Sequence, residues 1–150
     1  MTSDVETQDA QFDYDKSVVG VNVDLGEFRL SPEQVMKYCE AMGESNPLFA
    51  TGEIAPPGIL SSVSFPGSGL DAKVKFGNAT FMAGSRMEFF APIKANETLH
   101  VRTKVKEVYG KTGRSGTMVF VVRRTEFVGD SGDVVAAIEQ SQVHREVEAS

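Results

Sequence analysis

The sequence is poor in the residue types that most often reveal a disulfide or a metal site. Its 150 residues include one cysteine, two histidines and no tryptophan. The single Cys39 excludes an internal disulfide, and its place in a helical pattern favours a small buried side chain over a reactive thiol. We therefore predict neither a disulfide framework nor a metal site.

Positive charge and long apolar runs are also scarce. The net charge of -6 argues against nucleic acid as the main partner, because phosphate binding needs a basic surface. No run approaches the roughly 18 apolar residues that span a membrane, and the polar, acidic N-terminus does not resemble a signal peptide. We expect a cytoplasmic domain without membrane contact, of ordinary globular composition and large enough for its own core.

The first residues are predicted to form an acidic flexible tail, over residues 1–17, ahead of a single domain over residues 18–150. Acidic residues dominate the tail against a lone Lys16, and Phe12 and Tyr14 are its candidate anchors. Residues 18–23 are apolar and rich in β-branched side chains, which predicts a short strand.

A helix over residues 31–42 has the clearest local signature in the chain. Ser31 is placed to cap its N-terminus, Pro32 takes the first helical position, and Gln34 completes a capping box. Gly43 stands where a left-handed C-terminal cap is expected. One helix face carries apolar or small side chains at helical spacing, namely Val35, Tyr38, Cys39 and Met42.

The stretch after this helix, residues 43–58, reads GESNPLFATGEIAPPG and holds strong structure breakers. Asn46-Pro47 and Ala55-Pro56-Pro57-Gly58 interrupt regular structure and predict turns. The apolar run over residues 59–65 fits either a strand or a short buried helix, and its periodicity does not decide between them.

The rest of the chain predicts four long antiparallel strands. The first begins near residue 78, the second alternates from Leu99 to Lys106, and glycines at 110, 113 and 116 predict a hairpin loop. Residues 118–122 read as a central strand covered on both faces, residues 129–132 as a turn, and residues 134–143 as the last strand. One face of the first strand is predicted to carry Phe81, Ala83, Ser85, Met87 and Phe89.

An antiparallel sheet with one buried helix predicts an α+β fold in which the sheet curves around the helix. Open sheet edges are usually closed by a partner, so we expect dimerisation. The polar face of the second strand is basic. Such a face attracts phosphate groups or is simply solvated, and we favour the solvated interpretation. Its basic residues are Arg102, Lys104 and Lys106, with Lys111 and Arg114 in the next hairpin.

Several segments, in order, resemble a MaoC-like hot-dog domain of the N-terminal MaoC dehydratase type. They are SPEQVMKYCEAMGESNPLF, IAPPGILSS, FMAGSRMEFFAPIKANETL, KVKEVYGKTGRSGTMVFVVRRTEF and GDVVAAIEQSQVHRE, within residues 18–146. The resemblance implies a curved antiparallel sheet wrapped around a central α-helix near residues 57–66. It also implies pairing into double hot dogs, as a homodimer or as a heterodimer with a second MaoC-like chain.

The resemblance further implies an activity on thioesters. Active members add or remove water across the double bond of an enoyl thioester carried on coenzyme A or acyl carrier protein, with no cofactor, to give (R)-3-hydroxyacyl products. An Asp and a His in a D-x-N-P-x-H motif hold the reacting water and share the proton transfers. A backbone N–H at the start of the central helix holds the thioester oxygen, where negative charge develops.

This sequence departs from that motif at two positions. Glu44 stands where the motif has Asp, Asn46 and Pro47 match, and Phe49 stands where it has His. A phenyl ring transfers no proton, and neither His100 nor His144 is expected beside Glu44. Gly58 matches the glycine whose N–H binds the thioester oxygen. The candidate catalytic groups are therefore Glu44 and the Gly58 N–H, and the candidate substrate-binding residues are Asn46, Phe49, Pro57 and Ile59.

Each of these residues also has a purely structural interpretation. Glu44 fits an exposed carboxylate after a helix, Phe49 fits a packing residue in the wall of an acyl tunnel, and Gly58 fits a tight turn. Three hypotheses remain open. The first is a subunit whose partner chain supplies the Asp and His; the second is a self-sufficient hydratase using Glu44 or thioesterase using Glu53; the third is a non-enzymatic acyl-CoA binding or scaffold module.

Overall fold

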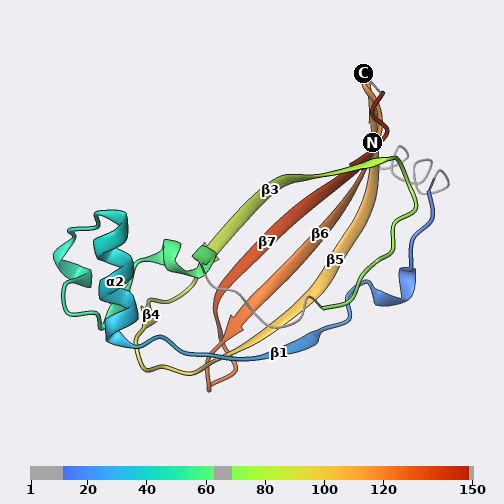
Figure 1. Cartoon of the computed structure of the whole chain (residues 1–150). Coiled ribbons are helices and arrows are strands. Elements are labelled where there is room, and N and C mark those ends of the chain that lie inside the picture. The colour runs from blue at the N-terminus through green and yellow to red at the C-terminus, as the bar shows by residue number, and fades with distance from the viewer. Residues whose placement is uncertain (1–11, 63–68, 149–150) are drawn as a thin grey trace.

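The computed structural model describes residues 12–62 and 69–148, which form a curved antiparallel sheet with short helices against it (Figure 1). The main sheet has five strands in the order β1-β5-β6-β7-β3. Their bounds are Val23–Phe28 (β1), Ala79–Phe89 (β3), Leu99–Gly113 (β5), Gly116–Val128 (β6) and Val134–Arg145 (β7). The α+β class and the four long strands are confirmed, and residues 118–122 lie within β6, the central strand.

The smaller elements gather near one end of the sheet. The helix α2 (Pro32–Met42) is followed by the 3-10 helix η3 (Pro47–Phe49), strand β2 (Ile54–Ala55) and the 3-10 helix η4 (Pro57–Ser62). Strand β2 pairs with β4 (Ile93–Lys94). In Figure 1, α2 lies beside β4, beyond the end of β3. The stretch over residues 43–58 is thus placed next to the end of a long strand.

The helix α2 forms as its sequence predicts. Ser31 Oγ accepts a hydrogen bond of 3.1 Å from the Gln34 N–H, and Gln34 Oε1 accepts one of 2.8 Å from the Ser31 N–H. These two bonds satisfy N–H groups that have no partner inside the helix. Gly43 ends the helix in the left-handed conformation with φ 68. Val35 and Cys39 are buried, which confirms the buried cysteine and part of the predicted apolar face. Met42 was wrongly placed on that face, because it ends the helix with a side chain that is 65% exposed.

Two apolar clusters hold the elements to the sheet. The main core cluster joins α2, η3 and η4 to β1, β5, β6 and β7, and its buried members include Val35, Phe49, Leu60, Val101 and Phe127. A second cluster lies farther along the sheet, where Phe12 and Ala72 pack against Val105 and Val119. Phe12 therefore belongs to the folded domain, whereas residues 1–11 of the predicted tail lie outside the described residues.

The predicted central helix is present in part and in a tighter form. Residues 57–62 form the 3-10 helix η4 rather than an α-helix, and residues 63–66 of the prediction lie outside the described residues. The Ser61 and Ser62 hydroxyls each donate a 2.7 Å bond to the carbonyl three residues earlier. For residues 59–62 the choice between strand and helix is therefore decided in favour of a helix.

Two predicted boundaries were wrong. Of residues 18–23, only Val23 belongs to strand β1, and Val19 forms a single bridge to Val105, because Gly20 turns the chain at φ 81. The hairpin loop predicted over residues 110–116 is only the two-residue turn between Gly113 and Gly116. Cross-strand pairing extends to the turn, and the Thr112 and Thr117 hydroxyls bond at 2.9 Å.

The predicted face of β3 is interrupted by a β-bulge. The register against β7 shifts between Met82 and Gly84, so Ala83 is an extra residue in the strand. Because neighbouring residues of a strand point to opposite faces, one extra residue inverts the alternation. Phe81 consequently lies on the face opposite to Ser85, Met87 and Phe89, where the sequence pattern placed all four together.

Candidate functional site

The predicted site residues come together around η3, the 3-10 helix that follows α2. Asn46 caps it, since its Oδ1 accepts a 3.0 Å bond from the Leu48 N–H. Glu44 follows the helix cap with an exposed side chain, and its N–H donates a 2.8 Å bond to the Cys39 carbonyl. These two bonds fix the backbone of residues 44–49 to the end of α2 and to the start of η3.

Two cavities flank this segment. The first, which we call the carboxylate pocket, has a volume of about 270 Å³ and is lined by Met36, Cys39, Glu40, Glu44, Ser45, Asn46, Phe49 and Ala50. The second, which we call the apolar groove, has a volume of about 300 Å³ and is lined by Leu48, Phe49, Ile54, Ala55, Pro57, Phe89, Phe90, Ala91, Pro92 and Ile93.

Among the described residues, Phe49 alone lines both cavities. It is 9% exposed and belongs to the main core cluster, so its ring is held in place by packing. Glu44 lines the carboxylate pocket with it, and Pro57 lines the apolar groove with it. The residue common to the two cavities therefore has a side chain that transfers no proton.

Gly58 lies beside a residue that sequence reasoning did not connect with it. A Cβ atom at position 58 would stand 2.7 Å from the Tyr38 Oη, well inside van der Waals contact. Gly58 is not among the glycines with positive φ, so the close approach of Tyr38, and not the backbone conformation, requires glycine here. The next residue, Ile59, is 3% exposed and is a core residue that lines neither cavity.

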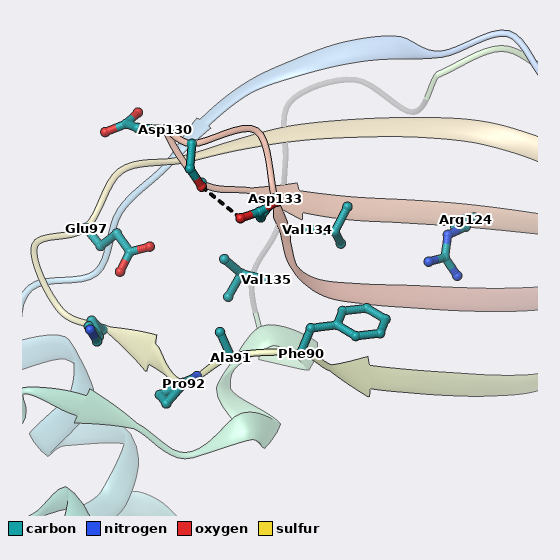
Figure 2. A pocket seen from close by; sticks show the side chains of 12 residues that line it. Phe90, Ala91, Pro92, Glu97, Arg124, Asp130, Asp133, Val134 and Val135 are labelled. Atoms are coloured by element: carbon teal, nitrogen blue, oxygen red, sulfur yellow. Dashed lines mark hydrogen bonds between the residues drawn. The ribbon is translucent and has the colours of Figure 1, made fainter.

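A larger cavity adjoins the apolar groove. It has a volume of about 850 Å³ and shares Phe90, Ala91 and Pro92 with the groove. Figure 2 shows these three residues along one side, with the turn that carries Asp130 and Asp133 opposite them. The remaining charged residues that line this cavity are Lys94, Glu97 and Arg124. Carboxylates outnumber cations among these lining residues, which disfavours a phosphate there.

The family is shown by a match over most of the sequence. A family model described as "FAS1-like, dehydratase domain region" matches residues 17–138. The chain belongs to this dehydratase family. The match spans both cavities, Tyr38 and Gly58, and the main sheet as far as Ile138 in β7. Comparison with curated proteins finds no match.

Solved structures agree on the hot-dog fold of this FAS1-like dehydratase domain. A chain of the ChsH1-ChsH2 complex from Mycobacterium tuberculosis is 16% identical, with a TM-score of 0.64 and coverage of 100% of this chain and 96% of that one. A chain of the HadBC (3R-hydroxyacyl-ACP dehydratase) complex from the same organism is also 16% identical, with a TM-score of 0.61 and coverage of 86% and 98%. A MaoC-like dehydratase from Rhodospirillum rubrum is 19% identical, with a TM-score of 0.56 and coverage of 87% and 94%.

The histidines of the dehydratase domain lie away from both cavities. His100 Nε2 stands 3.3 Å from Asp130 Oδ1, and His144 Nδ1 stands 3.1 Å from the Thr80 hydroxyl across the β3–β7 pair. Burial lowers the pKa of His144, against a smaller opposing effect of Asp71. Neither ring lines the carboxylate pocket or the apolar groove. A histidine does not replace the missing motif residue within this chain's described residues.

The other predicted groups are also accounted for. Glu53 is exposed and lines neither cavity, while its carbonyl accepts a 2.8 Å bond from the Ala95 N–H.

Among the residues that the structure describes, no group of three or more His, Cys, Asp and Glu is placed to hold a metal. No helix of the described part of the chain is long and apolar enough to cross a membrane.

Two cations on the basic face of β5 are paired with carboxylates of neighbouring strands. Arg102 Nε lies 2.8 Å from Glu126, and Lys106 Nζ lies 2.9 Å from Glu139. Arg124 joins the two glutamates at 3.0 and 2.7 Å. Sequence reasoning missed these partners because they follow from cross-strand register. The paired cations are poor candidates for holding the phosphates of coenzyme A.

The apolar groove also draws on residues that sequence reasoning did not select. Leu48, Phe89 and Phe90 line it and remain 56%, 38% and 57% exposed. Phe89 and Phe90 end the predicted strand just before Pro92, and that aromatic pair was the available signal in the sequence. The strand pattern does not predict that they line the same groove as Phe49 and Pro57, because this depends on the tertiary structure.

Proposed function

We propose that this chain is the acyl-binding subunit of an (R)-specific enoyl-thioester hydratase or 3-hydroxyacyl dehydratase. Its substrate is an acyl thioester of coenzyme A or acyl carrier protein, and its partner is a second MaoC-like chain that supplies the Asp and His. The observation that carries the proposal is Phe49. It is buried and lines both cavities where the motif has a histidine, and none of the described residues that line the apolar groove carries a proton-transfer group.

The groove is suited to the acyl chain. Its walls are apolar side chains and proline rings, and Pro57 at its edge precedes Gly58, whose N–H is the proposed donor to the thioester oxygen. Apolar groups leave water favourably in such a site, and a backbone N–H stabilises the charge that develops on the oxygen. In this proposal Phe49 and Pro57 line the acyl site, Asn46 shapes the turn, and Ile59 supports the groove from the core.

The neighbouring structures support a two-chain enzyme. Two of them are chains of named complexes, ChsH1-ChsH2 and HadBC. In a chain that lacks the motif histidine, a partner with an intact D-x-N-P-x-H motif restores the base and acid that hydration requires. The attacking water then loses its proton to that pair, while C2 of the enoyl group receives one.

Coexpression with a MaoC-like chain that carries the intact motif is the direct test. We expect a stable complex that removes the enoyl absorbance of crotonyl-CoA, while this chain alone does not. Replacing the partner's motif histidine with alanine should abolish turnover without dissolving the complex. If this chain alone hydrates crotonyl-CoA at a rate that Glu44→Gln abolishes, the proposal is wrong and the chain is a self-sufficient hydratase.

A second candidate function is favoured by the same apolar groove without proton-transfer groups. The chain would bind acyl-CoA as a carrier or scaffold module with no turnover in any pairing. Acyl-CoA would then raise the melting temperature of the chain, and the coexpressed pair would leave the enoyl absorbance unchanged. A free-thiol assay on the same samples separates both functions from a thioesterase, because only thioester hydrolysis releases coenzyme A.

A further inference from the structure

The Tyr38 hydroxyl and Gly58 meet in space although 20 positions separate them in the chain. A Cβ atom on residue 58 would lie 2.7 Å from Tyr38 Oη and 3.8 Å from Tyr38 Cζ. The oxygen, and not the ring edge, therefore faces Gly58. The Tyr38 hydroxyl therefore lies beside Gly58, whose N–H binds the thioester oxygen in the proposed function.

The position of this hydroxyl is set by packing. Tyr38 lies on α2 between Val35 and Cys39, which are 0% and 9% exposed, and its own ring packs against the main core cluster. A tyrosine ring held at its base and faces has few alternative rotamers. The Oη atom is thus a preorganised donor.

Neither donor at this place has an acceptor within the described part of the chain. The Tyr38 hydroxyl makes no hydrogen bond with a described residue, and the same holds for the Gly58 N–H. Polar groups in folded proteins find partners in protein, water or ligand. Two neighbouring donors without an acceptor among the described residues fit an oxygen supplied from outside the chain.

The spacing allows one oxygen to accept from both donors. The N and Cβ atoms of one residue are about 2.5 Å apart by standard geometry, so Tyr38 Oη lies within about 5.2 Å of the Gly58 nitrogen, given the 2.7 Å contact. One acceptor at about 2.9 Å from each donor spans a separation of that size.

We propose that Tyr38 is a second hydrogen-bond donor to the thioester carbonyl oxygen of the substrate, alongside the Gly58 N–H. This inference rests on the proposed function, because it takes the acyl thioester as the ligand. Tyr38 keeps its proton and donates only a hydrogen bond. That bond strengthens as enolate charge develops on the oxygen, so the two donors together form an oxyanion hole.

The test compares Tyr38→Phe with wild type in the full-length chain. The variant removes one oxygen and keeps the ring that packs in the core. The matched control is Tyr109→Phe on β5, whose ring stacks on Phe120 with centroids 5.0 Å apart and lines neither the groove nor the pocket. The probe is crotonyl-CoA labelled with ¹³C at the thioester carbonyl. Calorimetry measures binding, and infrared difference spectroscopy measures the labelled carbonyl stretch.

We expect Tyr38→Phe to weaken binding by about three- to tenfold, the effect of one lost hydrogen bond. The labelled carbonyl band should move to higher frequency in this variant, because a carbonyl with fewer hydrogen bonds has a stiffer C=O bond. Tyr109→Phe should match wild type in both measurements. The carbonyl band is the decisive readout, since a general loosening of the fold does not selectively remove one hydrogen bond from it.

Failure of the Tyr38 inference can be distinguished from failure of the proposed function. If wild type binds the probe and Tyr38→Phe shows the same affinity and the same carbonyl band, the Tyr38 inference is wrong while the proposed function stands. An affinity loss without a band shift also overturns it, because the hydroxyl then acts on packing alone. If wild type does not bind the probe, the proposed function fails and the Tyr38 inference fails with it.

Discussion

Phe49 connects the chemistry of this chain to its core. The ring is almost fully buried in the main core cluster, yet it forms part of the wall of both the carboxylate pocket and the apolar groove. At the position of the motif histidine, an apolar residue can pack where an imidazole would need a polar partner. Phe49 therefore contributes packing at the position where the motif histidine would transfer a proton.

Replacing Phe49 with alanine should destabilise the fold strongly. Loss of a buried phenyl ring removes its transfer free energy and leaves a hole, so we expect a decrease of about 3–5 kcal/mol in the free energy of unfolding. Urea unfolding followed by circular dichroism measures it. The matched control is the adjacent Leu48→Ala, whose side chain is 56% exposed and should change stability by about 0.5 kcal/mol or less. Equal losses in the two variants would contradict the core role of Phe49.

Gly58 and Tyr38 should be energetically coupled. In Gly58→Ala the new methyl group meets the Tyr38 hydroxyl at 2.7 Å, so we expect a loss of about 1–2 kcal/mol in unfolding free energy. The double variant Tyr38→Phe/Gly58→Ala removes the clashing oxygen and should recover about 1 kcal/mol of that loss. Denaturant unfolding of the four proteins in this cycle supplies the coupling energy. Strict additivity would mean that the two residues are not in contact.

At the scale of elements, an ion-pair ladder crosses the face of the sheet that carries Arg102. Arg102, Lys106 and Arg124 alternate with Glu126 and Glu139 over three neighbouring strands. Burial by itself raises the pKa of Glu126, but hydrogen bonds and charges from Arg124 and Arg102 outweigh it and lower the pKa. For Glu139, the Lys106 hydrogen bond lowers the pKa, burial opposes this, and Arg124 reinforces the lowering.

This ladder predicts acid sensitivity. A carboxyl whose pKa is lower in the folded protein than its ordinary 4.5 binds protons more readily when unfolded. Its stabilisation is fully present above that value and is lost as pH falls below 4.5 toward the lowered folded pKa. Stability measured by urea unfolding should therefore decrease over this acidic range. Glu139→Gln should flatten the decrease, while Glu27→Gln, an exposed residue of β1, should follow wild type. Parallel curves for all three proteins would refute the role of the ladder.

At the scale of the whole molecule, strand β3 lies at an edge of the sheet, and within residues 12–62 and 69–148 it pairs with β7 alone. It also carries exposed apolar side chains, with Phe81 at 50% and Met82 at 61%. An exposed apolar edge strand is a ready surface for another chain. These two side chains lie near the start of β3, and the candidate groove lies at its other end, beside Phe89. The proposed partner surface and the proposed acyl site thus lie along the same strand.

Met82→Lys should weaken association with the coexpressed MaoC-like chain by about tenfold or more, because it places a charge in the apolar interface. The control is Met42→Lys at the end of α2, where the side chain is 65% exposed and should tolerate the charge. Size-exclusion chromatography with light scattering across a concentration series measures both. Unchanged association in both variants would exclude the β3 edge as the interface.

The sequence predicted the elements whose signals are local. The capping box at Ser31 and the cap at Gly43 lie within the helix that they bound, and the alternation from Leu99 to Val105 lies within one strand. The bulge at Ala83 and the extension of β5 to Gly113 were missed, because both depend on pairing with another strand. Cross-strand register is likewise what joins Arg124 to Glu139.

The sequence alone determined the fold class, α2, the long strands and the absence of the motif histidine at Phe49, since each follows from residue type and short-range spacing. Only the tertiary structure decided that Phe49 lines both cavities, and that the Tyr38 hydroxyl stands where a side chain on Gly58 would begin. Contacts between α2 and η4 join residues far apart in the chain. The spacing of residues within α2 or within η4 does not predict these contacts.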